Sequence, residues 1–182
     1  FWCVGAAYGP PDKIWLAKFS SSGTVLANKA IAPVNGATFI GQRMLAVPNG
    51  LLVSGVAVWP GNGKARAFAA EINTSNYSVV WHAYVPRDHT LGRSIADIGG
   101  GVYGMAIHGQ DQVGLFGVVN ASGFGAEIGP ISDGERMILD AVYSPTFGWT
   151  VAGHKGLGGN SDGWIGRADV FGNLGCAASG EC

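Results

Sequence analysis

The chain has 182 residues, of which 31 are glycine, and only 13% of its residues are charged. Glycine costs about 1 kcal/mol relative to alanine inside a helix, so this composition disfavours helices and favours an all-β chain with many turns. A hydrophobic fraction of 47% provides a sizeable core and excludes a disordered chain. The formal charge of −1, without any run of like charges, gives no support for a nucleic-acid partner or an anionic membrane surface.

The chain begins inside an apolar strand, FWCVGAAYG at residues 1–9, without a methionine or a charged leader segment. We therefore expect a processed mature protein or, by preference, part of a longer chain. No stretch is apolar enough for a transmembrane helix, so membrane insertion is not expected.

The next segment, WLAKFSSSGTV, has the pattern of a strand that ends in a tight hairpin turn, and this pattern returns three more times. The copies recur about every 50 residues, which indicates a repeated supersecondary unit. Each copy begins with a bulky apolar residue, and we expect these residues to pack between sheets at equivalent positions. They are Trp15, Phe68, Leu115 and Trp164.

A polar turn closes each copy. Its ninth position tolerates a positive φ angle, and a polar side chain before it is placed to bond the turn backbone. The ninth positions are Gly23, Asn76, Gly123 and Gly172, and the bonding side chains are those of Ser20, Asn73, Asn120 and Asp169.

Further strands complete each unit. An apolar strand precedes each copy, at residues 1–9, 51–59, 103–111 and 149–157. In this strand Gly5, Gly55 and Gly153 coincide, with Ile107 the exception, and small residues there are expected to let neighbouring sheets approach closely. Another strand follows each turn, best seen at residues 77–84, and one more begins near Arg43, Arg93 and Arg136.

Four strands in about 50 residues are typical of a β-propeller blade, which is a four-stranded antiparallel sheet arranged radially with others. The sequence predicts one β-propeller domain over residues 1–182, with repeat units of roughly 1–35, 36–87, 88–131 and 132–178. The first unit lacks an innermost strand, which it must borrow from the C-terminal end or from sequence outside this chain. A four-bladed ring is one solution, and the C-terminal portion of a larger propeller is the one that we favour.

The last unit carries a family resemblance. Residues 148–154 read GWTVAGH, and residues 161–174 read SDGWIGRADVFGNL. This segment resembles the repeat of bacterial secreted β-propellers of the SBBP type, in which a G-W/Y-x-V-A-G strand precedes D-x-W-L-x-K-L-D-x-x-G-N. The first copy, at Lys13–Phe19, is a fair match, and the middle two are degenerate. The resemblance implies an extracellular or cell-surface bacterial protein and no defined activity.

The main candidate site is a set of three arginines, Arg43, Arg93 and Arg136, at the start of the inferred innermost strands. If they converge on a channel mouth, their guanidinium groups form a site for a sulfate, a carboxylate or an acidic sugar. The alternative, which we favour, is internal pairing. Asp97 and Asp140 follow Arg93 and Arg136 by four residues and therefore share their strand face.

His108 and His154 occupy equivalent positions at the ends of two of the apolar strands. Without a third ligand they predict no metal site, and we expect solvated loop histidines that the blade geometry holds apart. The run Gly99–Gly104 matches G-x-G-x-x-G by letter, but a strand follows it where a dinucleotide site needs a helix. It therefore predicts a hairpin turn, and we expect no cofactor and no enzyme activity.

The three cysteines are Cys3, Cys176 and Cys182. In a chain that looks secreted, the short spacing of the last two favours a disulfide between them, with Cys3 outside that bond. Cys3 is then paired outside this chain or is a buried thiol. The rival is a bond from Cys3 to Cys176 or Cys182 that closes a four-bladed ring.

These features predict a non-catalytic extracellular or cell-surface module that contacts other protein chains, or missing blades of its own protein, within a larger assembly. The alternative is a ligand-binding or enzymatic propeller whose rim or channel takes a small anion or a carbohydrate.

Overall fold

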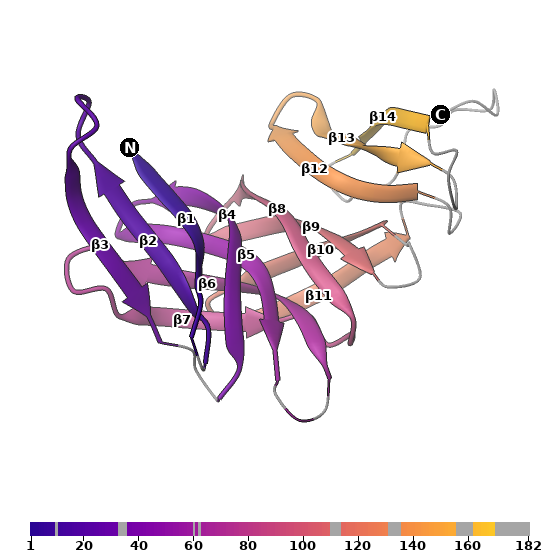
Figure 1. The fold of residues 1–182 in the computed structure, drawn as a ribbon. Helices are drawn as coiled ribbons and strands as arrows, with labels where there is room; N and C mark the ends of the chain where they lie inside the picture. The colour runs from indigo at the N-terminus through magenta and orange to yellow at the C-terminus, as the bar shows by residue number, and fades with distance from the viewer. Residues whose placement is uncertain are drawn as a thin grey trace, which may run out of the picture. The chain divides into compact units, whose positions relative to one another are not determined.

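The structure is a computed structural model that describes residues 1–9, 11–32, 36–59, 61, 63–109, 114–130, 136–155 and 162–169. In these ranges the chain forms fourteen β-strands and no helix, and the strands make four antiparallel sheets (Figure 1). The all-β prediction is therefore confirmed. The chain divides into two compact units, Phe1–Gly92 and Arg93–Cys182, and the radial arrangement of blades stays a prediction.

Unit 1 contains two sheets in which the strands lie side by side in chain order. The first sheet has three strands, β1 (Trp2–Ala7), β2 (Lys13–Phe19) and β3 (Val25–Ile31). The second sheet has four strands, β4 (Thr38–Val47), β5 (Gly50–Val58), β6 (Ala65–Asn73) and β7 (Val79–Tyr84).

Unit 2 follows the same plan. Its four-stranded sheet begins just before the unit boundary and consists of β8 (Thr90–Gly99), β9 (Val102–Gly109), β10 (Gly114–Asn120) and β11 (Gly123–Pro130). The last sheet consists of β12 (Arg136–Ser144), β13 (Gly148–Lys155) and β14 (Asp162–Ala168). The turn predicted to end at Gly172, and the strand expected near Cys176, lie outside the described residues.

The pairing register follows the alignment of the repeats. The bulky residue that opens each hairpin segment lies directly opposite the aligned position of the preceding strand. The pairs are Gly5 with Trp15, Gly55 with Phe68, Ile107 with Leu115 and Gly153 with Trp164. Strand β1 is therefore the counterpart of β5, β9 and β13.

Polar side chains bond the backbone of the described hairpin turns, as predicted. Asn73 Oδ1 accepts a hydrogen bond from the Ser75 N–H, and Asn120 Oδ1 accepts one from the Ser122 N–H, both at 2.8 Å. Ser20 Oγ accepts one from the backbone N–H four residues later at 3.0 Å. Side chains of this kind stabilise turns locally, so the sequence alone was sufficient to find them.

The predicted positive φ angles are present at Gly23 (84°) and Gly123 (125°), but the prediction for Asn76 is wrong. In that hairpin the positive φ, 61°, falls on Tyr77. The turn closes between Asn73 and the residue five places later, which is one residue longer than the turn after Ser20, so the left-handed position moves along by one. The glycine run 99–101, with φ between 67° and 102°, forms the predicted hairpin turn between β8 and β9.

The core of unit 1 lies between its two sheets. Ile14 and Leu16 of β2 are fully buried and belong to one cluster with Phe39 of β4 and Phe68 of β6. Phe68 therefore packs between sheets, as predicted. Trp15 alternates with Ile14 and Leu16 along the strand, so it points away from this core. It is half-buried, and the prediction that it packs between sheets is not met in unit 1.

The core of unit 2 is built around Trp149 of β13, which is 1% exposed. Its ring lies 4.8 Å from that of Phe116 in β10, measured between centroids. Ile138 and Trp164 complete the cluster from the last sheet, so Trp164 packs between sheets as predicted. Leu115, the fourth aligned residue, is also buried.

Sheets approach each other closely at two glycines to which the sequence analysis gave no packing role. A Cβ atom on Gly41 of β4 would lie 2.6 Å from Val4 Cγ2 of β1. A Cβ atom on Gly104 of β9 would collide with the indole ring of Trp149. Each glycine thus receives a side chain from the other sheet of its unit.

The prediction that Gly5 and Gly55 let neighbouring sheets approach closely is wrong. A Cβ atom on Gly5 would make only ordinary contact with the ring of Trp15, which belongs to the same sheet. Gly55 faces the backbone of Ile40 in the neighbouring strand, where a bulge between Gly41 and Arg43 shifts the register. Its missing side chain accommodates that bulge rather than another sheet.

Candidate functional site

The three arginines singled out from the sequence lie in corresponding strands. Arg43 lies in β4, Arg93 in β8, and Arg136 opens β12. Arg43 is exposed and Arg93 is half-buried, while the side chain of Arg136 lies outside the described part. Because Arg43 belongs to unit 1 and the other two to unit 2, the convergence of all three stays a prediction.

The two carboxylates expected to pair with these arginines bond backbone groups close by. Asp97 Oδ1 accepts a hydrogen bond from the Gly99 N–H at 2.8 Å, and Asp140 Oδ1 accepts one from the Ala141 N–H at 2.9 Å. Both bonds are local, so internal pairing between these carboxylates and the arginines stays a prediction.

The expectation of solvated loop histidines is wrong. His108 is only 7% exposed and lies in β9, and His154 is half-buried in β13. Both strands continue past the histidine, to Gly109 and Lys155, so both histidines lie in strands and not in loops. The Nδ1 atoms of both rings are buried and make no hydrogen bond within the part of the chain described.

These two histidines lie near Arg93 in a group that we call the basic cluster: Arg93, His108 and His154. Burial, the charge of Arg93 and the charge of His154 lower the pKa of His108, with burial the largest cause. The members come from β8, β9 and β13, and the Nε atom of Arg93 is buried as well. His108 is therefore neutral at neutral pH, and the cluster brings nitrogen-bearing side chains of two sheets together inside unit 2.

Sequence reasoning missed this cluster although part of the signal was present. The repeats align His108 with His154, but the assumed blade geometry separates them. Arg93 and His108 lie at equal distances from the tight glycine turn between β8 and β9, and antiparallel pairing brings such residues side by side. Counting residues back from the turn along both strands therefore places Arg93, one of the three candidate arginines, beside His108.

Among the described residues, strand β1 is an edge strand of the first sheet. The N-terminal amine of Phe1 donates to the Phe19 carbonyl at 2.9 Å, and the Phe19 N–H donates to the Phe1 carbonyl at 2.8 Å. Hydrogen-bonded and non-hydrogen-bonded pairs alternate in an antiparallel ladder. The backbone groups of Trp2, Val4 and Ala6 therefore point away from β2, and among the described residues no strand pairs with them.

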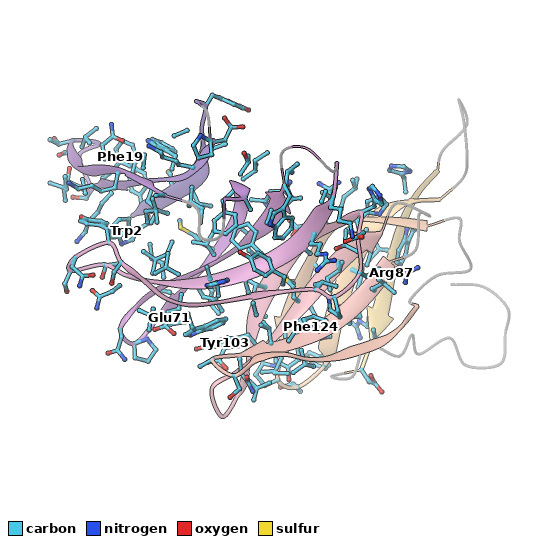
Figure 2. The ribbon with its side chains drawn as sticks, turned by 90° about the horizontal axis from the view of Figure 1, so that it is seen from below. Trp2, Phe19, Glu71, Arg87, Tyr103 and Phe124 are labelled. Atoms are coloured by element: carbon cyan, nitrogen blue, oxygen red, sulfur yellow. The ribbon has the colours of Figure 1, made fainter. Side chains whose placement is uncertain are left out.

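On the outer face of the first sheet, strand β1 contributes small residues. Cys3, Gly5 and Ala7 lie on this face with Trp15, whereas Trp2, labelled with Phe19 in Figure 2, lies on the core side. Cys3 is half-buried and forms no disulfide with any other described residue. The disulfide predicted between Cys176 and Cys182 falls outside the described residues.

Unit 1 also carries an ion-pair group on its surface. Asp88 accepts hydrogen bonds from Arg66 Nε at 2.6 Å and from Lys64 Nζ at 3.0 Å. These two hydrogen bonds lower the pKa of Asp88 below its usual value. The Arg66 guanidinium also lies over the Trp59 ring, 5.8 Å from its centroid. The group ties β6 to the loop after β7.

The described residues contain no group of three or more side chains suited to hold a metal ion. In the same part of the chain, no helix is long and apolar enough to cross a membrane. Comparisons of the whole chain with protein-family models, curated proteins and solved structures gave no match.

Proposed function

We propose that this chain is a non-catalytic β-propeller module, extracellular or on a cell surface, that contacts other protein chains through the β1 edge. The observation that carries the proposal is the place of β1 in the repeat. Its counterparts β5, β9 and β13 are each flanked by strands on both sides, whereas β1 is flanked only by β2 among the described residues. An unpaired edge is a template for the addition of a strand.

The surroundings of this edge support the same role. The six residues of β1 are all half-buried, while the seven consecutive residues Leu51–Ala57 of its counterpart β5 are all buried. A central strand of a stacked sheet has both faces covered, as β5 does. The partial burial of β1 therefore suits an edge strand that pairs with a strand of another protein chain.

The secreted or cell-surface location rests on the resemblance of residues 148–154 and 161–174 to SBBP-type repeats. The low charge and the repeated hairpins are compatible with such a module. The propeller arrangement itself is supported by the two sheet pairs, in which the strands follow chain order and the aligned bulky residues share one register.

Hydrogen exchange of individual backbone amides tests the open edge. We expect the outward amides of Trp2, Val4 and Ala6 to exchange rapidly in dilute protein. The inward amides of Cys3 and Gly5, which face β2, are the matched internal control and should be protected. Slow exchange of the outward amides that persists at every dilution would mean that a strand of the same chain fills the edge, and would overturn the proposal.

A proline at an outward position provides a second test. Ala6→Pro removes an N–H that faces the open edge and leaves the hydrogen bonds to β2 in place, so it should prevent strand addition without unfolding the sheet. If the protein self-associates, sedimentation should show association lost in Ala6→Pro and kept in Val80→Ala, an exposed position in β7. Association that survives Ala6→Pro would exclude the β1 edge as the contact.

A further inference from the structure

We propose that the basic cluster binds a small oxyanion, with the chemistry of a sulfate, a phosphate or a carboxylate, and that binding takes up a proton. The cluster lies within unit 2, so this inference does not rest on the β1 edge or on the protein-contact role. The proposed site differs from the three-arginine set predicted from the sequence, because it combines Arg93 with His108 and His154.

Two buried imidazole nitrogens point to a ligand. His108 is 7% exposed, and the Nδ1 atoms of His108 and His154 have no hydrogen-bond partner in the described part of the chain. A buried polar group without a partner costs free energy, and native proteins leave few of them. An oxyanion that reaches either of these nitrogens can accept a hydrogen bond from its Nδ1–H group.

The charges around the cluster select an anion. Arg93 on β8 and His154 on β13 both act on His108 as positive charges. Strand β10 carries no ionisable residue, β12 carries Arg136 and Asp140, and β13 ends at Lys155. A metal cation would meet the Arg93 charge, whereas an oxyanion would gain charge-assisted hydrogen bonds from the guanidinium and from a protonated imidazole.

Proton uptake follows from the lowered pKa of His108. Burial and the two positive neighbours, Arg93 and His154, keep this imidazole neutral. A bound anion favours the charged imidazolium, so it raises the pKa, and the protein takes up a proton when the anion binds. By linkage, anion affinity must then rise as the pH falls.

Sulfate is the appropriate probe because its charge does not change between about pH 8 and about pH 5.5, the range in which histidine titrates. We expect calorimetric titration to give a sulfate affinity that rises by up to about tenfold per pH unit for each proton taken up. Sodium chloride at the same ionic strength is the control for general salt effects. A sulfate affinity that does not change with pH, or no binding at about pH 5.5, would overturn the proposal.

Three variants locate the site. His108→Asn and Arg93→Gln should each lower the sulfate affinity at least tenfold at acidic pH. Arg43→Gln, at the corresponding strand of unit 1, is the matched control and should bind as the native chain does. Loss of binding in Arg43→Gln would assign the anion to the three-arginine set and contradict the cluster.

If His108→Asn does not fold, the native chain still gives the answer. Nuclear magnetic resonance follows the titration of the His108 ring, and sulfate should raise the pKa of His108 while the ring resonances of the exposed His89 keep their positions. An unchanged His108 titration in the presence of sulfate would exclude the site.

Discussion

The two units pair their sheets in the same register but fill the space between them differently. In unit 1 Phe39 and Phe68 stack at 4.8 Å with nearly parallel rings, and the branched side chain of Val4 sits against Gly41. In unit 2 one large ring, that of Trp149, lies over Gly104 and contacts residues of both sheets. The units therefore share a backbone plan and differ in the side chains that fill the space between the sheets.

This difference shows what the repeat constrains. The backbone register returns in each sheet, whereas the contact across the sheets is made by a different pair of residues each time. In unit 1 the side chain of Val4 lies against Gly41, and in unit 2 the indole ring of Trp149 lies against Gly104. Because tightly packed interiors respond to each missing group, loss of the large Trp149 ring should weaken unit 2 more than loss of a smaller side chain weakens unit 1.

Removal of the Trp149 ring should therefore have the largest effect. Trp149→Ala leaves a large cavity at a position that is 1% exposed, and substitutions of this kind cost about 3–5 kcal/mol. We expect the amides of β9 and β13 to lose protection from hydrogen exchange while those of β5 keep theirs. Denaturant unfolding gives the total loss of stability.

The matched control is Trp15→Ala, at a half-buried tryptophan on the outer face of the first sheet. Trp15 donates a hydrogen bond to Asn28 at 2.8 Å but lies outside the core cluster, so the loss should be clearly smaller. Equal losses for the two tryptophans would contradict the comparison.

Local features of this fold could be predicted from the sequence. The strands follow from the alternation of apolar and polar residues. The turns after Ser20 and Asn120 follow from side chains that bond nearby backbone groups. Both patterns can be recognised over a few residues. The approach of Val4 to Gly41 was not visible, because it joins two sheets from distant parts of the chain. The burial of His108 was missed for the same reason.

Adding a methyl group at the two close approaches should have the next largest effect. Gly104→Ala places a Cβ atom against the buried Trp149 ring, and overpacking of this kind costs about 1–3 kcal/mol. Gly41→Ala meets Val4, which lies on the half-buried edge strand and can shift more easily. We expect the smaller loss for Gly41→Ala in thermal unfolding, and the reverse order would mean that β1 is held more rigidly than Trp149.

A smaller difference between the units should appear when the pH is lowered, because His108 makes the stability of unit 2 depend on pH. Because the pKa of His108 is lowered in the folded chain, the unfolded chain binds more protons below about pH 6.5. The stability of unit 2 should be complete above that pH and decrease as the pH falls towards and through the lowered pKa. His108→Gln should flatten this decrease, and His89→Asn, which changes an exposed histidine in unit 1, should not. A decrease that persists in His108→Gln would assign the pH dependence to another group.

The smallest effect is expected at the ion pairs of Asp88 in unit 1. The pKa of Asp88 is lowered, so its contribution is present above the usual value of 3.8 and is lost as the pH falls below it. Exposed ion pairs contribute little, and the loop after β7 has a second anchor, because Thr90 Oγ1 accepts a hydrogen bond from the Ala67 N–H at 2.9 Å.

Asp88→Asn should therefore leave the loop in place and remove only the part of the stability that depends on salt. Unfolding at low and at high ionic strength measures that part, since salt screens exposed charges. Asp12→Asn is the control, because Asp12 accepts a hydrogen bond from the Gly9 N–H, which an amide oxygen can also accept. A large loss in Asp88→Asn at high salt would show that the loop depends on Asp88 itself, and the two units would then differ less than their cores suggest.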